Sequence, residues 1–241
     1  MNPTEEIYTE LQQAYENFNA KLFENKLPMS MITLQREKNT YGYFSAQRFS
    51  NHEGETTDEI ALNPAFFAII PLLEIMQTLV HEMCHQFQHH YGKPGRARYH
   101  NAEWARMMTD RGLMPSQTGK PGGKKTGDRM NDYPIEGGIF LSACNDLLTQ
   151  QFQISWYDRF VLESNVKPAE EHPESLGLPE NGTKVNGNAN LVRIVRNKSN
   201  RIKYTCRCKT KIWGKPGLQV TCGVCHSQFQ ENTNEQHQHN T

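Results

Sequence analysis

The segment 71–91 restricts the fold most strongly, because apolar side chains recur in it every three or four residues. These side chains are Leu72, Ile75, Met76, Leu79, Met83 and Phe87. The periodicity predicts a helix with one buried face, which Pro71 opens and Gly92 ends. The same helix also carries four histidines, with Glu82 directly after the first of them.

The rest of the chain predicts shorter elements of both kinds around this helix. Residues 4–25 and 102–112 have helical periodicity, and Thr4 could cap the first of these helices. Residues 29–36, 41–49 and 58–63 are rich in β-formers and predict short strands. Residues 115–138 are rich in glycine and proline and predict a loop. Residues 139–163 predict an ordered region whose elements the sequence does not define. The expected fold class is therefore α+β.

The stretch H-E-M-C-H at residues 81–85 has the spacing of a metal-binding helix. Side chains four positions apart share a helix face, so His81 and His85 can reach one cation. Neutral imidazoles suit Zn²⁺, and Glu82 can take a proton from water and pass it to a leaving amine. The pattern favours zinc-dependent hydrolysis of a peptide bond. The alternative is a histidine-rich helix that binds no metal.

A third ligand must come from beyond the turn that Gly92 begins. His89 lies about 12 Å along the helix axis from His81, too far to share one ion. His100 is the first histidine after the turn, and Glu103 is the first carboxylate. Either residue could complete the site. His52, His89 and His90 are expected at the surface or beside the ligands.

H-E-M-C-H, the glycine turn and Y-H-N-A-E-W together resemble the SprT-like metalloproteases, a family that includes the Spartan DNA–protein crosslink proteases. The stretches LFENKLP and EIALNP are similar to that family as well. The resemblance covers about residues 5–115 and implies a zincin-like metalloprotease domain. It also implies that His81, His85 and His100 bind the catalytic zinc and that Glu82 is the catalytic acid and base.

Two positions depart from the pattern of that family. Asn101 follows the third histidine, where the family usually has glycine. Trp104 stands where the family usually has phenylalanine. Residues from about 116 onward form an extension that the resemblance does not explain.

Four cysteines near the end of the chain form a C-x-C-x13-C-x2-C pattern. They are Cys206, Cys208, Cys222 and Cys225. Four thiolates are enough for a closed structural zinc site, and we expect a small β-rich zinc ribbon there, with Tyr204, Ile212 and Trp213 packed around the ion. Because C-x-C is one residue shorter than the usual knuckle, His226 could replace one of these thiolates. Reduced free thiols or a redox pair would also be consistent with the pattern.

Charge is distributed unevenly, although the 241 residues carry no formal net charge. Residues 181–230 contain ten lysines and arginines and no acidic residue. Positive charge attracts phosphates, and flat rings stack on unpaired bases, so we expect this region to bind DNA. The candidate nucleic-acid-binding residues are Arg193, Arg196, Lys198, Arg201, Lys203, Lys209, Lys211 and Trp213. The alternative is an ordinary solvated basic face.

The sequence therefore predicts four regions. They are a protease domain (1–163), a linker (164–190), a basic zinc-ribbon module (191–230) and a disordered tail (231–241). We expect two zinc ions, one catalytic and one structural, and protein substrates held on DNA. Rival interpretations are an inert DNA-binding zinc-ribbon protein and a general cytosolic peptidase.

Two further features limit the class of protein. The stretch GKPGGKKTG at 119–127 lacks the glycine that a phosphate-binding loop places before Lys-Thr, so no nucleotide site is expected. No apolar run reaches the length of a membrane span, and the acidic N-terminus does not resemble a signal peptide. A cytoplasmic protein without a membrane partner is expected.

Overall fold

The computed structural model describes residues 2–37, 40–97, 99–150, 152–162, 178, 192–195 and 201–231. The chain divides into two compact units, residues 1–195 and 196–241, each of which is described by itself. The first unit mixes helices with small sheets, so its fold class is α+β, as predicted. None of the helices in the described ranges combines the length and apolar character needed to cross a membrane.

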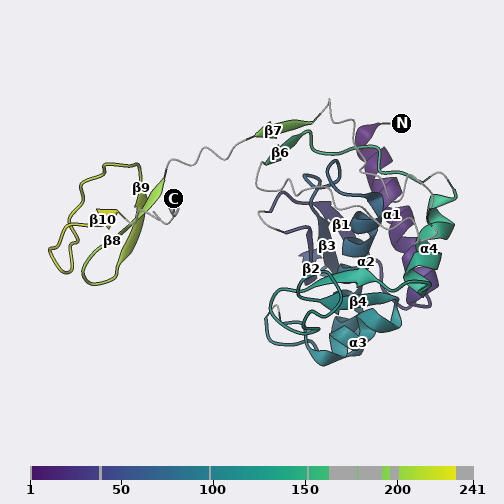
Figure 1. Ribbon diagram of the computed structural model, residues 1–241. Helices are drawn as coiled ribbons and strands as arrows, with labels where there is room; N and C mark the ends of the chain where they lie inside the picture. Colours follow the sequence, from purple (N-terminus) through teal and green to yellow (C-terminus); the bar gives the residue numbers. More distant parts are fainter. Residues whose placement is uncertain are drawn as a thin grey trace, which may run out of the picture. The chain divides into compact units, whose positions relative to one another are not determined.

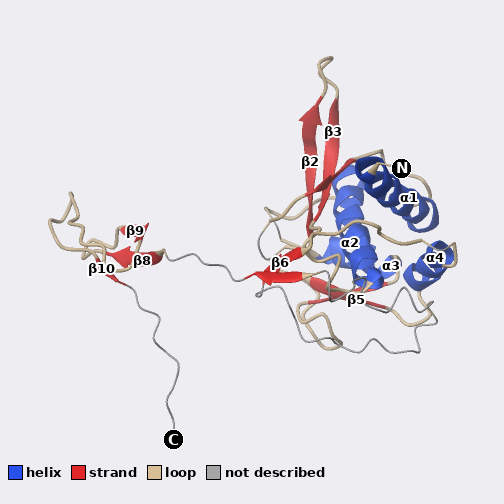
Figure 2. Ribbon diagram, turned by 90° about the horizontal axis from the view of Figure 1, so that it is seen from above, coloured by secondary structure: helices blue, strands red, loops and turns tan. Residues whose placement is uncertain are grey.

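Three strands form one sheet of the first unit, in the order β1-β3-β2. β1 (Met31–Leu34) runs parallel to β3 (Thr56–Leu62), and β2 (Gly42–Ser50) runs antiparallel to it. A bulge interrupts the pairing of β2 with β3 between Ser45 and Phe49. Figure 2 shows β2 and β3 as a long hairpin that projects away from the helices. All three strands match the predicted segments to within two residues at each end.

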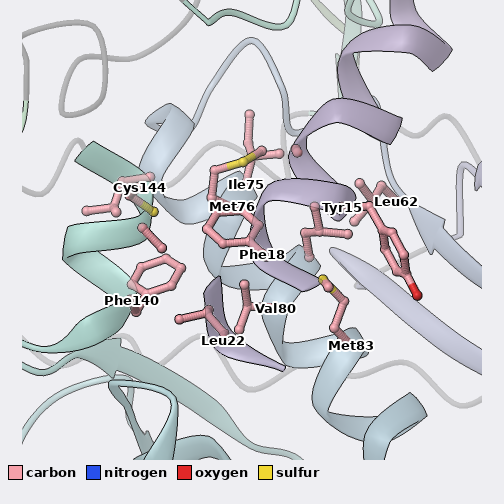
Figure 3. Packing of buried hydrophobic residues seen from close by; sticks show 14 of the residues in the cluster. Tyr15, Phe18, Leu22, Leu62, Ile75, Met76, Val80, Met83, Phe140 and Cys144 are labelled. Carbon is pink, nitrogen blue, oxygen red and sulfur yellow. The ribbon is translucent and has the colours of Figure 1, made fainter. Parts of the chain in front are cut away.

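The core of this unit lies between helices that are far apart in the sequence. α1 (Pro3–Leu22) and α2 (Leu72–Tyr91) bury the apolar faces that the sequence predicted. Asn2 is the N-cap of α1, because its side chain accepts a hydrogen bond from the Glu5 amide. The prediction that Thr4 caps this helix is therefore wrong. Figure 3 shows Phe18 of α1 beside Phe140, with ring centroids 5.9 Å apart. α2 lies in the centre of the unit (Figure 1).

The region after α3 (Ala102–Asp110) is more ordered than the sequence predicted. β4 (Leu113–Ser116) and β5 (Asn131–Pro134) form an antiparallel hairpin, so the prediction of an uninterrupted loop over 115–138 is wrong. The connection between these strands is rich in glycine and proline, and this composition led to the prediction of a loop for the whole segment. α4 (Ile139–Leu148) follows and packs against α1.

β6 (Phe160–Leu162) and β7 (Arg193–Val195) pair in parallel within the first unit. The predicted zinc-ribbon module began at residue 191, whereas β7 pairs with a strand of the preceding unit. Apart from Leu178, which packs against the core, the predicted linker lies outside the described residues. The predicted tail also lies outside them except for Glu231. The bounds of the four predicted regions stay predictions.

The second unit is a small antiparallel sheet of three strands in the order β10-β8-β9. The strands are β8 (Ile202–Thr205), β9 (Lys211–Gly214) and β10 (Gln230–Glu231). Tyr204, Cys206, Cys222 and Phe229 form its buried centre. The Tyr204 hydroxyl donates a hydrogen bond to the Lys215 carbonyl oxygen at 2.6 Å and is 2.8 Å from a Glu231 carboxylate oxygen. These bonds tie the two ends of the unit together.

Candidate functional site

Three histidines from two segments converge beside α2. His81 and His85 lie one helical turn apart on α2, and His100 lies just before α3. One ring nitrogen from each lies within 4.8 Å of one from each of the others. The Nε2 atoms of His81 and His100 are 3.3 Å apart. Two nitrogens in a tetrahedral zinc shell, each about 2.05 Å from the ion, are separated by about 3.3 Å, so this pair has the spacing that zinc requires.

The buried indole of Trp104 packs against all three imidazoles. Its ring centroid lies 4.8 Å from that of His81, 5.2 Å from that of His85 and 4.4 Å from that of His100. The indole therefore contacts the whole set at once. Trp104 is fully buried, so substituting a smaller side chain would leave a cavity beneath the candidate ligands.

Asn101 has a local role that explains its presence after His100. Its side-chain oxygen accepts hydrogen bonds from the Trp104 backbone amide at 2.9 Å and from Gln88 Nε2 at 2.8 Å. Its side-chain nitrogen donates to the Lys93 carbonyl oxygen. Asn101 is therefore the N-cap of α3 and holds the turn that brings His100 back to α2.

Glu103, the alternative third ligand, faces away from the histidines. Its Oε2 atom accepts hydrogen bonds from the Lys93 amide at 2.7 Å and from Gln88 Nε2 at 2.8 Å. A Cβ at Gly92 would lie 2.7 Å from this oxygen, so a larger residue there would displace the Glu103 carboxylate. The structure brings His100, and not Glu103, to the two helix histidines.

Two groups in the region after α3 orient the candidate ligands. His81 Nδ1 lies 3.0 Å from the Asp132 carboxylate on β5, and His100 Nδ1 lies 3.0 Å from the Gly127 carbonyl oxygen. Backbone bonds between His100 and Gly127 run in both directions. Because an acceptor holds the proton on each Nδ1, each Nε2 atom keeps a free lone pair. The Nε2 lone pairs of His81 and His100 can therefore bind a metal. Asp132 was not predicted, because it lies 51 positions after His81 and no motif joins the two residues.

The pKa values of the three histidines separate one ring from the other two. Burial, together with the charge of His81, lowers the pKa of His85 well below its usual value and that of His100 to about 4. Burial also acts to lower the pKa of His81, but the hydrogen bond to Asp132 and the charges of Glu82 and Asp132 outweigh it and raise the value. His85 and His100 are therefore neutral at pH 7, the form that binds a metal.

Glu82 lies next to His81 on α2 and is only 7% exposed. Burial raises the pKa of its carboxyl to about 6, and the Asp132 carboxylate acts in the same direction. The charge of His81 and a backbone hydrogen bond from Phe44 oppose this rise. A carboxyl with a pKa near neutrality exchanges protons more readily in both directions than one at its ordinary value. This is the property that a proton carrier in hydrolysis needs.

The other histidines in the described part of the first unit lie away from this group. His52 is exposed in the turn between β2 and β3. His90 Nε2 lies 2.7 Å from Asp58 Oδ2, and the ring of His89 lies 5.9 Å from that of Phe44. Neither joins His81, His85 and His100, in agreement with the expectation that they lie outside the ligand set.

The four cysteines of the second unit form a second candidate metal site. Their sulfur atoms all lie within 4.8 Å of one another, with 3.6 Å between Cys208 and Cys222. Sulfurs bound tetrahedrally at about 2.3 Å are separated by about 3.8 Å, close to this value. No disulfide joins these cysteines. His226, the alternative ligand, is exposed on the adjoining turn and does not belong to the group.

Nearby hydroxyl groups favour the thiolate form of two of these cysteines. Ser227 Oγ lies 3.0 Å from Cys225 Sγ, and its hydrogen bonds lower the pKa of that thiol to about 5. Thr210 Oγ1 lies 3.2 Å from Cys208 Sγ and lowers the pKa of that thiol. Because thiolate is the form that binds a metal, these hydroxyls add to the case for a metal site.

The predicted nucleic-acid-binding residues divide between the two units. Arg193 lies on β7 of the first unit, and Arg196 and Lys198 lie outside the described residues. On the hairpin of β8 and β9, Lys203 pairs directly with Trp213 across the strands. The remaining members, all exposed, are Arg201, Lys209 and Lys211. Trp213 was expected to pack beside the cysteines, but it is 62% exposed, so that expectation is wrong.

Comparison with known proteins places these observations in a family. The family described as SprT-like matches residues 11–119, which include the three histidines, Glu82 and Trp104. An "Uncharacterized protein in mucB 3'region" of Salmonella typhimurium is 63% identical over 59 residues, 24% of this chain and 80% of that protein. No solved structure gave a significant match. The chain belongs to the SprT-like family.

Proposed function

We propose that this protein is a zinc-dependent endopeptidase with a zincin-like protease domain, and that it cleaves proteins held on DNA. The observation that carries the peptidase is the convergence of three histidine nitrogens beside the buried carboxyl of Glu82. Membership of the SprT-like family supports the same activity. The DNA-linked substrate class rests on the basic second unit.

The donor set fits zinc better than a hard cation. Three imidazole nitrogens without a carboxylate in the group are typical of zinc, whereas magnesium and calcium prefer oxygen ligands. Three protein ligands leave one tetrahedral position for water or substrate. When bound, a zinc ion supplies Lewis-acid chemistry, which polarises the scissile carbonyl and makes water more acidic.

The side chains of the chain then perform the proton transfers. The carboxylate of Glu82 accepts a proton from the attacking water, and it donates that proton to the leaving amine when the peptide bond breaks. Asp132 and the Gly127 carbonyl oxygen keep His81 and His100 oriented throughout. Trp104 closes the opposite side of the imidazoles and excludes water there.

The outer face of β8 and β9 supports DNA as the partner. Tyr204 and Ile212 point into the buried centre of the second unit, so the alternating residues Lys203, Lys211 and Trp213 share the outer face. An exposed indole between two ammonium groups can stack on an unpaired base while the lysines bind the flanking phosphates. This face would hold the enzyme beside proteins that are bound to the same strand.

Cleavage of a DNA-bound protein tests the proposal. The full chain is loaded with zinc and incubated with a protein crosslinked to single-stranded DNA and with the same protein free of DNA. We expect faster cleavage of the crosslinked protein, and no cleavage by the Glu82→Gln variant. Glu136→Gln, a substitution in the turn after β5, is the matched control.

The outcomes separate the parts of the proposal. Equal cleavage of the free and crosslinked substrates would leave a general peptidase and refute the role of DNA. DNA binding without cleavage by the wild-type chain would favour an inert DNA-binding protein. Cleavage by Glu82→Gln at the wild-type rate would refute the proposed proton carrier.

A further inference from the structure

A third group of potential ligands lies at the C-terminal end of α2, apart from both sites described above. It consists of Asp58 on β3 and of His89 and His90, the last two histidines of α2. One ligand atom from each lies within 4.8 Å of one from each of the others. His89 is four residues beyond His85, which places it about 6 Å further along the helix axis. We propose that these three residues form a second divalent-metal site of the first unit, one that binds Zn²⁺ or a similar transition-metal ion.

The carboxylate of Asp58 is already fixed for this role. Its Oδ1 atom accepts a hydrogen bond from the Gln47 backbone amide at 2.9 Å, and Gln86 Nε2 lies 3.3 Å from its Oδ2 atom. Gln47 lies within the β2 bulge and has a φ of +49°, a conformation that is unfavourable for a residue other than glycine. The bulge therefore maintains an unusual backbone conformation that directs an amide at this carboxylate.

The charge balance of the group favours a cation. Asp58 is only 4% exposed, and within the described ranges no lysine or arginine forms an ion pair with it. Its charged partner there is His90, and only when that ring is protonated. A bound divalent ion would neutralise the buried carboxylate while both imidazoles stayed neutral.

His89 has both ring nitrogens available and lies where solvent can reach it. Among the described residues, the contacts of its ring are with Phe44 and His90, and none is a hydrogen bond. His89 and His90 are both exposed to solvent, whereas Asp58 is buried. An ion can therefore approach from the histidine side and meet a buried carboxylate behind them. Two imidazoles and one carboxylate suit zinc, cobalt, nickel or copper better than calcium or magnesium.

The present spacing of Asp58 and His90 is that of a hydrogen bond. The His90 Nε2 to Asp58 Oδ2 distance is 2.7 Å, whereas two ligand atoms on one zinc ion lie about 3.3 Å apart. The ion would therefore replace the proton between them and widen the pair by about half an ångström. Because the His90 side chain is 31% exposed, it has room to move by that amount.

Zinc titration of the full chain tests this site without depending on peptidase activity. Equilibrium dialysis against increasing free Zn²⁺, followed by elemental analysis, should find a third equivalent that binds more weakly than the first two. His89→Gln should weaken the third equivalent at least about tenfold and leave the first two unchanged, because removing a ligand costs more than removing a supporting group. His90→Gln should do the same.

His52→Gln is the matched control, since His52 is an exposed histidine in the turn of the β2–β3 hairpin. It should leave all three equivalents unchanged. His89→Gln breaks no hydrogen bond among the described residues, so its result is decisive even where His90→Gln fails to fold. A third equivalent that is absent at all zinc concentrations, or that persists in His89→Gln, overturns the proposal. The first two equivalents report separately on the histidine and cysteine sites of the proposed function.

Discussion

Asp132→Asn should weaken zinc binding at His81, His85 and His100 although Asp132 is not among the candidate ligands. Asp132 lies between two donors, since one carboxylate oxygen is 3.0 Å from His81 Nδ1 and the other is 3.2 Å from Gln77 Nε2. An asparagine has one oxygen and one NH2 group, so it can accept from one of these donors and must oppose the other. The substitution is therefore not conservative, despite its matching shape.

The size of the effect follows from the role of such a carboxylate. Removing a group that orients a metal-binding histidine typically weakens metal affinity about 10–100-fold, or about 1.4–2.7 kcal/mol. Asp132 is largely buried, with a side chain 7% exposed, so water cannot readily replace it. We expect Asp132→Asn to weaken zinc affinity about tenfold, because Gln77 can rotate its amide to suit the new side chain. Asp132→Ala should weaken it nearer one hundredfold.

Competition with a chromophoric zinc chelator would measure this affinity. The wild-type chain, loaded with only two equivalents of zinc, should release them in two steps, one from the histidines and one from the cysteines. The substitution should shift only the histidine step, whereas Glu136→Gln, in the turn after β5, should shift neither. Wild-type affinity in the Asp132→Asn variant would refute the reasoning that Asp132 supports His81.

The other predictions concern each proposed site in turn. Glu82→Gln should keep both zinc ions, as measured by elemental analysis, while the rate of peptide cleavage falls by about 10²–10⁴-fold, since an amide cannot carry the proton. Trp104→Ala should lower the free energy of unfolding by about 3–5 kcal/mol, seen as a lower Tm, because it empties the space under three imidazoles. Lys203→Ala should reduce the slope of log affinity for DNA against log salt by about one, because one phosphate contact is lost. Trp213→Ala should weaken binding of single-stranded DNA by about 1–3 kcal/mol in a titration. It should weaken binding of duplex DNA much less, because duplex bases are already stacked.

The parts of the fold that the sequence predicts are those with local periodicity. The predicted start of α2 agrees with the structure to within one residue, because its apolar residues recur at helical spacing and proline and glycine bound it. The strands β1 to β3 were also predicted, because each lies in a short segment rich in β-formers. β5 was missed because it follows a connection rich in glycine and proline, and β6 was missed because it has three residues and pairs with β7, which is distant in the sequence.

The residues of the candidate site also divide into those that a local sequence pattern predicts and those that depend on tertiary contacts. His81, Glu82 and His85 are readable because one helix supplies them at fixed spacing. The selection of His100 over Glu103 depends on the turn geometry that Asn101 imposes, which the sequence alone leaves open. The support from Asp132 and Gly127 depends on tertiary contacts with β5 and the loop before it, so no local pattern reveals it.

The two rows of side chains along α2 have a consequence for how this chain can change in length. His81, His85 and His89 form one row at intervals of four residues, and Glu82, Gln86 and His90 form the row beside it. A single residue inserted between 81 and 90 would turn every later side chain by about 100° and separate the members of both rows together. The segment 119–125 has no such constraint, provided that Gly127 still reaches His100. Insertions and deletions among relatives should therefore be tolerated in that loop and absent from the second half of α2.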